Sequence, residues 1–310
     1  MADERNFRSY YYEKVGFRAV EEKKSIELLL KEKPLDVEKL RQYCLRFPVS
    51  ARYRIYLWKL VLGVIPANQE SHDFVMKNRT EQYNTIRRAL EIMRKIDKET
   101  PDNIVFLKMF LIEEGRLPLN DNKIMLKSSH RIFACFAEAM LAMVESPVDA
   151  YWMSKNFYRM TTYCSHLFVP DIDKIKQLLS KEDGDQKLIK HLDMVNVWNH
   201  LPLKEWFGSC FCSVLPEASF ERVGDKVLGG STVILTYVTV ALFMTLKRPL
   251  LSMTSAKEMC DYLAQVPEDS GDILVSKGID IWEKHGHHLT KSESPGPQNR
   301  SPISISTSNK

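Results

Sequence analysis

Glycine is scarce in this sequence, with 12 glycines among 310 residues. Sandwiches and barrels of antiparallel strands depend on tight turns, and glycine is the usual residue in such turns. Leu, Lys, Glu, Met and Ala are common instead, and these residues favour helices. The composition therefore favours a helical fold over an all-β fold.

Long hydrophobic runs are also absent. The longest, VILTYVTVALFMTL at residues 233–246, is too short for an ordinary bilayer span. We expect it to form a buried helix, although its β-branched residues would also allow a strand. The first residues, MADERNFRSYYYEK, are charged and contain no apolar core, so we expect no secretory signal peptide. The six cysteines are then expected to be reduced thiols in the cytosol.

A clustered basic stripe is missing as well. The formal net charge is +4 and the isoelectric point is about 8.6, but basic and acidic residues are interleaved along the chain. Nucleic-acid-binding modules usually gather their lysines and arginines on one face and interleave aromatic residues. The sequence does not favour that class of function.

Apolar residues recur at helical spacing in most of the chain. The clearest stripe is Ile55, Trp58, Leu62 and Ile65, in a helix that should end near Gly63 and Pro66. The same spacing predicts further helices over residues 80–100, 131–144, 149–163, 171–180, 200–215, 217–228, 231–247 and 255–265.

The chain divides into four segments by composition. Residues 1–49 are expected to be an N-terminal helical extension, residues 50–250 the main domain, and residues 251–285 C-terminal helices packed on it. Residues 286–310 are rich in Ser and Pro, and we predict a disordered tail. Its Ser-Pro dipeptides fit proline-directed phosphorylation, but they are also common in any disordered tail.

Cys210 and Cys212 lie one residue apart in WFGSCFCSVLP, residues 206–216. In a strand both thiols would share a face and could bind a metal ion together. In a helix they would point to nearly opposite sides. The apolar spacing predicts a helix, with Cys210 in the core and Cys212 on the other side. No second Cys or His pair has zinc-type spacing, so we expect neither a metal site nor a cofactor.

The same stretch carries a family pattern. Its aromatic residues and final Leu-Pro resemble the W-F-x-x-x-F-x-x-x-L-P segment of TBC domains, the family of Rab GTPase-activating proteins. Three more blocks occur in the family's order: RIYLWKLVLG at 54–63, DAYW at 149–152 and RVGD at 222–225. The last resembles a block normally written R-x-W-D. The residues that carry the resemblance are Trp58, Asp149, Trp152, Trp206, Phe211, Pro216 and Asp225.

The resemblance implies an all-α, two-lobed array of many short helices over about residues 50–250. Catalytic members are similar in supplying an arginine from an I-x-x-D-x-x-R block and a glutamine from a Y-x-Q block. The arginine offsets charge on the transferred phosphoryl group, and the glutamine orients the attacking water.

Neither block is found. In the expected window the spacing is kept by Ile86, but Ala89 replaces the acid and Ile92 the arginine. None of the seventeen aspartates has an arginine three positions later, and none of the seven glutamines follows a tyrosine by two. Counting without gaps places Arg131 near the glutamine position. Arg131 begins an apolar helix, so we expect a cap or interface role. The sequence predicts a pseudo-GAP, which is not an enzyme.

The resemblance extends to the branch of the family found in the tuberous sclerosis complex. It implies binding to the hamartin coiled coil and, through hamartin, to tuberin, which acts on the GTPase Rheb and so restrains mTOR signalling. It also implies a cytoplasmic location, peripheral on lysosomal or vesicle membranes through partners. The alternative is an active Rab GTPase-activating protein that uses unconventional residues: Arg87, Arg88, Arg94 or Arg131. A third class of function is a metal or thiol enzyme, but the Cys and His residues of the sequence form no recognisable set for such chemistry.

Overall fold

The computed structural model describes residues 20–285, apart from the side chains of residues 20–21 and 121–123. Every regular element in that range is a helix, which confirms the all-α prediction. The proposed tail and the first nineteen residues lie outside the described range, and the segment boundaries stay a prediction.

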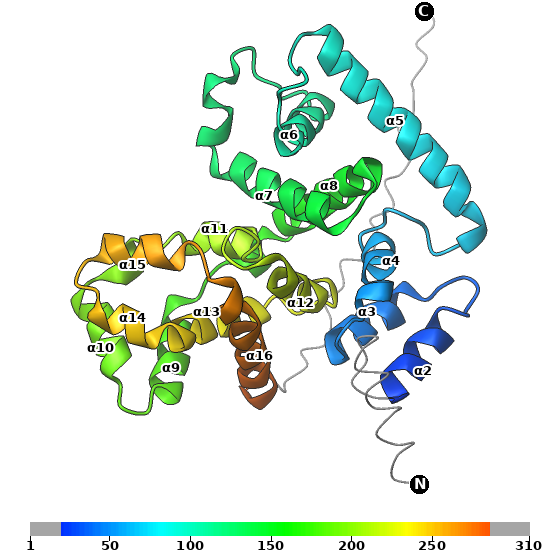
Figure 1. The fold of residues 1–310 in the computed structure, drawn as a ribbon. Helices are drawn as coiled ribbons and strands as arrows, with labels where there is room; N and C mark the ends of the chain where they lie inside the picture. Colours follow the sequence, from blue (N-terminus) through cyan, green and yellow to red (C-terminus); the bar gives the residue numbers. More distant parts are fainter. Residues whose placement is uncertain (1–19, 286–310) are drawn as a thin grey trace, which may run out of the picture.

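Three groups of helices make up the fold (Figure 1). The first group, at lower right, is α2 (Val20–Leu29), α3 (Val37–Arg46) and α4 (Ala51–Val61). It has a small apolar core of its own, in which Leu40 and Leu57 are fully buried. Asp36 caps α3 by accepting a hydrogen bond from the backbone N–H of Lys39 at 3.0 Å, as expected for a helix N-cap.

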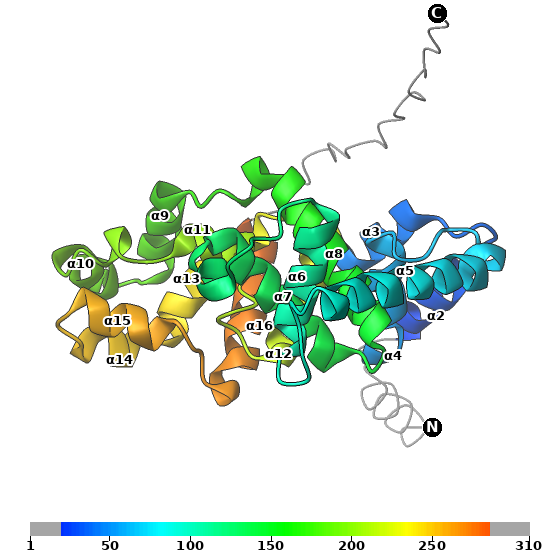
Figure 2. The same ribbon diagram turned by 90° about the horizontal axis from the view of Figure 1, so that it is seen from above.

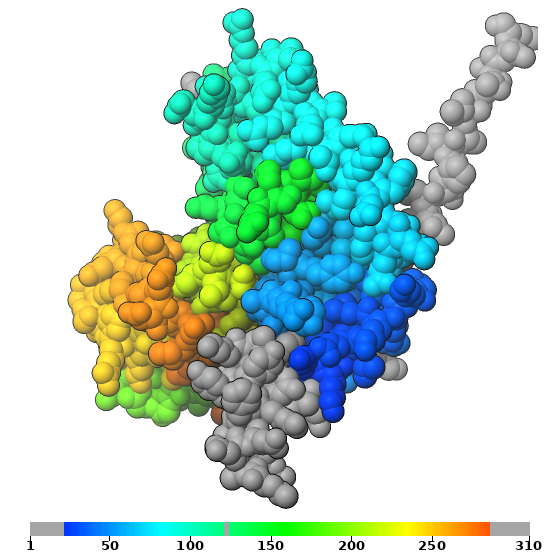
Figure 3. All heavy atoms as spheres, turned by 45° about the vertical axis from the view of Figure 1, so that its right-hand side comes forward, coloured from blue at the N-terminus to red at the C-terminus, as the bar shows by residue number. Residues whose placement is uncertain are grey.

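The upper group has the long helix α5 along its right-hand edge in Figure 1. Its elements are η1 (Gln69–Ser71), α5 (His72–Ile92), α6 (Asp102–Glu113), η2 (Asp121–Leu126), α7 (Ser128–Met143) and α8 (Pro147–Tyr163). Helices α7 and α8 pack side by side beneath α5 in Figure 1. In the space-filling view of Figure 3 this group forms the upper lobe.

The third group forms the other lobe, at lower left in Figure 1. Its elements are η3 (Ser165–Phe168), α9 (Ile172–Glu182), α10 (Lys187–Met194), η4 (Val197–Asn199), α11 (Leu203–Gly208), α13 (Ile234–Thr245), α14 (Lys247–Ser252) and α15 (Ala256–Leu263). Helices α12 (Glu217–Leu228) and α16 (Glu268–His285) lie towards the centre. Seen from above in Figure 2, the third group lies on the left, α2, α3, α4, α5 and α8 lie on the right, and α6 and α7 overlie α12 and α16 in the middle.

Helix α13 is the long apolar run, and it is a buried helix as predicted. All of its residues from Ile234 to Phe243 are buried, and α16 crosses it closely. A Cβ atom on Gly278 would stand 3.3 Å from the Cα of Val238, so the absent side chain lets the two backbones approach. In the described part of the chain, no helix is long and apolar enough to cross a membrane.

Helix α5 is displaced from its prediction of 80–100. It begins at His72 and ends at Ile92, because Arg94 takes a left-handed backbone conformation with φ of 54°. The backbone N–H of Lys95 then donates to the carbonyl of Leu90 at 2.9 Å. Glycine is the usual residue in such a left-handed turn at the end of a helix. The sequence has arginine at this position, so it gave no signal that the helix ends here.

Candidate functional site

Two of the family blocks meet at Asp225, on α12. The indole Nε1 of Trp58 donates to its Oδ1 at 2.7 Å, and the Nε of Arg54 lies 3.2 Å from its Oδ2. Arg54 also pairs with Glu221 one turn earlier on α12 and donates to the carbonyl of Val49 at 2.8 Å. The two blocks therefore join α4 to α12 through one buried carboxylate.

Burial sets the electrostatics of this junction. It raises the pKa of Asp225 to about 6, although Arg54 and the hydrogen bond from Trp58 act in the opposite direction. Burial also lowers the pKa of its neighbour Lys226. The Lys226 ammonium group donates to the carbonyls of Cys44 and Leu45 at 3.1 and 2.9 Å. A cation at the C-terminal end of α3 is placed favourably for the helix dipole.

Gly224 departs from the family pattern, which has tryptophan there, and Trp58 shows why the site tolerates glycine. A Cβ on Gly224 would lie 2.5 Å from Cη2 of Trp58, which is closer than real contacts allow. The Trp58 indole is fully buried and packs edge-on against Phe220, with ring centres 6.1 Å apart. The Trp58 indole thus fills the space beside Gly224 on α12.

The third block, on α8, contributes Asp149 and Trp152. Asp149 Oδ2 pairs with the Nζ of Lys59 at 2.9 Å, which ties α8 to α4. Trp152 donates from Nε1 to the carbonyl of Arg79 on α5 at 3.3 Å. The Arg79 guanidinium lies 4.4 Å from the Trp152 ring centre, within cation–π range. These residues hold α4, α5 and α8 together.

Lys155, also on α8, forms a buried ion pair with Glu113 on α6 that was not predicted from the sequence. Lys155 is 3% exposed, and its Nζ lies 2.7 Å from both carboxylate oxygens of Glu113 on α6. The same carboxylate accepts hydrogen bonds from Tyr151 and, at 2.9 Å, from Gln82 on α5. The group joins α5, α6 and α8, so it supports the position of α5.

The aromatic residues of the fourth block are buried. Trp206 and Phe211 are 3% and 0% exposed, with ring centres 5.7 Å apart. Pro216 stands at the N-cap of α12. All three residues contribute to the packing of α11 and α12, and none of them faces an open site.

The predicted helix over 200–215 is wrong after Gly208. Helix α11 ends there, and Cys210 and Phe211 both take left-handed conformations, with φ of 53° and 62°. Single left-handed turns cost energy for non-glycine residues, and the complete burial of Cys210 and Phe211 opposes that cost. Cys210 is in the core as predicted, but Cys212 belongs to a different turn.

The thiol of Cys212 donates to the carbonyl of Cys135 on α7 at 3.1 Å. It therefore faces α7 and is not on the far side of a common helix. Within residues 20–285 no three His, Cys, Asp or Glu residues are grouped so as to hold a metal ion.

The residues that the sequence predicts to be degenerate catalytic positions lie in the upper lobe. Ala89 is partly buried near the end of α5, whereas Ile92, predicted to stand in the arginine position, is 72% exposed. Arg131, on the first turn of α7, has its guanidinium engaged. Its Nε and a terminal nitrogen pair with both oxygens of Glu205 on α11, at 2.8 and 2.9 Å. The other terminal nitrogen donates to the carbonyl of Leu126 at 2.9 Å. Arg131 thus bridges α7, η2 and α11.

Of the other three candidate arginines, Arg87 and Arg88 lie in the last turns of α5 and Arg94 lies in the turn that follows it. Arg87 donates to the hydroxyl of Tyr83 at 3.1 Å and lies 3.7 Å from a carboxylate oxygen of Asp102. Arg88 and Arg94 are exposed. Unlike Arg131, these two make no side-chain hydrogen bond or ion pair to another described residue.

Comparisons with known proteins show which family this chain resembles. The family described as the Rab-GTPase-TBC domain matches residues 131–251. TBC1 domain family member 7 of Homo sapiens is 43% identical over 283 residues, covering 91% of this chain and 96% of that protein. The protein of the same name from Danio rerio is 39% identical, with 92% and 97% coverage.

A solved structure has a similar fold. The crystal structure of the Ypt/Rab-GAP domain of Gyp1p superimposes with a TM-score of 0.53 at 14% identity, covering 86% of this chain and 98% of that one. The sequence relatives, the matched family and the shared fold agree, and the chain belongs to the TBC domain family.

Proposed function

We propose that this chain is a non-catalytic TBC-domain subunit, a pseudo-GAP that binds a coiled-coil partner. The observation that carries the proposal is the state of the two catalytic positions. Ile92, which the sequence predicts to stand where catalytic members carry arginine, has an apolar, exposed side chain. Arg131, near the glutamine position, has its guanidinium occupied by Glu205 and by the carbonyl of Leu126.

The energetic consequence is large. An arginine finger contributes a factor of about 10³–10⁵ in rate, or roughly 4–7 kcal/mol of transition-state stabilisation. An isoleucine contributes no charge to that transition state. Binding of a partner is a separate matter, since recognition does not require groups that act only in the transition state.

The partner that we propose is the coiled coil of hamartin and, through it, tuberin. In this assembly the chain would stabilise the tuberous sclerosis complex and so support restraint of mTOR signalling through Rheb. An all-helical domain is suited to packing against partner helices. The proposed location is cytoplasmic, peripheral on lysosomal or vesicle membranes through these partners.

Two measurements test the proposal. Single-turnover GTP hydrolysis by a panel of Rab GTPases should proceed at its intrinsic rate when the purified chain is added. Immobilised chain should retain a hamartin coiled-coil fragment and should not retain an unrelated coiled coil of similar length. Failure to retain any hamartin fragment would contradict the proposal that this chain is a non-catalytic subunit that binds the hamartin coiled coil.

A second candidate is an active Rab GTPase-activating protein. The exposed Arg88 and Arg94 favour it, because neither guanidinium is engaged by another described residue. A hundredfold acceleration of GTP hydrolysis that is lost in Arg88→Ala or Arg94→Ala would establish this activity and overturn the pseudo-GAP proposal.

A further inference from the structure

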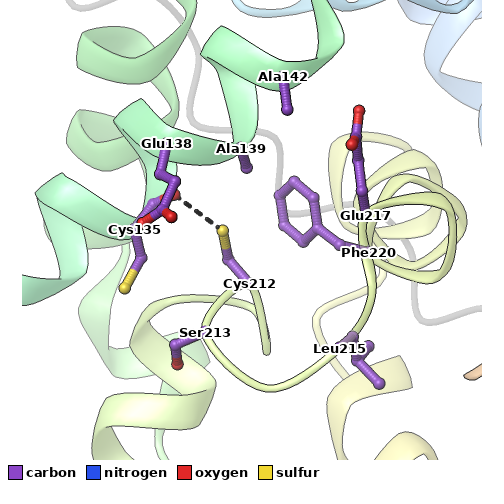
Figure 4. A pocket seen from close by; sticks show the side chains of 9 residues that line it. All are labelled: Cys135, Glu138, Ala139, Ala142, Cys212, Ser213, Leu215, Glu217 and Phe220. Carbon is purple, nitrogen blue, oxygen red and sulfur yellow. Dashed lines mark hydrogen bonds between the residues drawn. The ribbon is translucent and has the colours of Figure 1, made fainter. Parts of the chain in front are cut away.

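A cavity of about 250 Å³ opens between α7 and the segment that leads into α12 (Figure 4). Its wall on one side is Cys135, Glu138, Ala139 and Ala142 of α7. The opposite wall comprises Cys212, Ser213, Leu215, Glu217 and Phe220. Cys212, Ser213 and Leu215 belong to the fourth family block, but the residues that carry the resemblance there, Trp206, Phe211 and Pro216, do not line the cavity.

The two carboxylates of the cavity have no counter-charge. Glu138 and Glu217 are both exposed, and neither forms an ion pair or hydrogen bond with any residue between 20 and 285. The nearest arginine on the same helix, Arg131, lies two turns before Glu138 and is held by Glu205. Both charges therefore border the cavity without a partner cation from the described part of the chain.

Part of the cavity wall is apolar. Leu215 and Phe220 are 6% and 1% exposed, and in Figure 4 the Phe220 ring lies between Glu217 and α7. The methyl groups of Ala139 and Ala142 complete this surface. An apolar wall with an acidic rim is complementary to a group with an aliphatic stem and a cationic head, as in arginine and lysine.

The cysteines do not make this a thiolate metal site. Burial raises the pKa of Cys135 to about 11, and burial raises that of Cys212 well above its usual value. Both thiols are therefore protonated at neutral pH, and among the described residues no three His, Cys, Asp or Glu side chains are grouped so as to hold a metal ion. The charge available to a ligand comes from the two glutamates.

Size limits the occupant further. At about 250 Å³ the cavity is below the range of roughly 300–1,000 Å³ that is usual for small-molecule sites. One long side chain is a better match. Arginines that enter such pockets are common among the residues that dominate interface energies, and the guanidinium group pairs well with carboxylates.

We propose that this cavity receives a basic side chain, an arginine or lysine, from a partner protein that docks across α7 and the start of α12. The Glu138 and Glu217 carboxylates pair with its cationic head, and Ala139, Ala142 and Phe220 contact its aliphatic stem. The site acts in partner recognition and is independent of whether the chain accelerates GTP hydrolysis.

The test uses the full chain with labelled alanine and leucine methyl groups. N-acetylarginine methylamide is titrated while the methyl signals of Ala139, Ala142 and Leu215 are followed by NMR. N-acetylcitrulline methylamide, which has nearly the same shape without the charge, is the matched ligand control. We expect saturable shifts with the arginine compound alone, weakened by added salt because the rim charges are exposed.

Variants then identify the groups responsible. Glu138→Gln combined with Glu217→Gln should weaken binding by about tenfold or more, because two charge-assisted interactions are lost. Glu258→Gln, at an exposed position on α15, removes one negative charge elsewhere and should leave the affinity unchanged. Circular dichroism checks that each variant is folded. Absence of saturable shifts, equal binding of the citrulline compound, or full affinity in the double variant would each overturn the proposal.

Discussion

Trp58 and Gly224 share a single space in the centre of the molecule. The ring atom Cη2 of Trp58 lies 2.5 Å from the point where a Cβ on Gly224 would stand, while its Nε1 donates to Asp225, the next residue, at 2.7 Å. The hydrogen bond fixes the indole, so the ring cannot withdraw without losing it. Glycine at position 224 is thus coupled to tryptophan at position 58.

The substitution Gly224→Ala should therefore destabilise the fold. Its added methyl group would collide with a buried, hydrogen-bonded ring, and overpacking of this kind costs about 1–3 kcal/mol. The matched control is Gly184→Ala, since nothing lies within 4 Å of a Cβ there. Urea denaturation followed by tryptophan fluorescence measures both variants. Equal midpoints for the two variants would show that Trp58 can move aside.

The substitution Lys155→Met should lower the free energy of unfolding by more than Gly224→Ala does. It leaves the Glu113 carboxylate with Tyr151 and Gln82 but without its cation, and removing one partner of a buried pair costs about 3–5 kcal/mol. Lys284→Met is the control, because Lys284 is largely exposed where it pairs with Glu182 and exposed pairs contribute about 0–1 kcal/mol.

Adding Glu113→Gln to Lys155→Met should recover part of that loss in the free energy of unfolding, since no buried charge then remains unpaired. A double variant as unstable as the sum of the two single variants would contradict the coupling that the geometry implies.

Much of the helical framework could be read from the sequence. Helix α12 has the predicted bounds of 217–228, and the buried helix α13 and helices α7 and α8 lie close to their predicted ranges. These helices have an apolar stripe or a proline at the start, such as Pro147 in the first turn of α8. Local signals of that kind are independent of the tertiary structure.

The parts that were missed depend on packing. Helix α6 has every residue from Val105 to Leu111 buried, even Lys108, so no single stripe marks its face. The left-handed turn at Cys210 and Phe211 has no glycine to signal it. The contacts of Glu113 with Lys155 and of Arg131 with Glu205 span 42 and 74 residues, and no local pattern encodes such pairs.

Stability should fall as pH rises through the range in which Asp225 ionises. Its pKa is about 6 in the folded chain against 3.8 for the ordinary group, so the folded state binds more protons between these values. The free energy of unfolding then decreases from about pH 4 to about pH 6, by at most about 1.4 kcal/mol per pH unit. Above pH 6 this contribution is constant.

The control for this prediction is Asp225→Asn, in which the slope due to this group should disappear. Burial also raises the pKa of Glu221, which pairs with Arg54, so Glu221→Gln must be measured alongside. Denaturation at a series of pH values gives all three curves. A slope that is unchanged in Asp225→Asn would assign the dependence to other groups.

Arg131 should prove to be a structural residue. Arg131→Ala removes a two-point pair with Glu205 and a hydrogen bond to the carbonyl of Leu126. We expect a loss of roughly 1–2 kcal/mol, because the pair is half-exposed but the carbonyl bond is made by a charged donor. Arg88→Ala, at an exposed position without such contacts, should change stability by less than about 0.5 kcal/mol.

The same two variants separate structure from catalysis. If Arg131 acted as a finger, its removal would abolish an acceleration of Rab GTP hydrolysis that the unaltered chain provides, and the loss would exceed that of a thermally matched variant such as Gly224→Ala. We expect instead that all of these proteins leave the intrinsic rate unchanged, while Arg131→Ala alone of the two arginine variants lowers the denaturation midpoint. Acceleration by the unaltered chain that vanishes in Arg131→Ala but persists in Gly224→Ala would make Arg131 catalytic, because the two variants lose similar stability but only one loses the guanidinium.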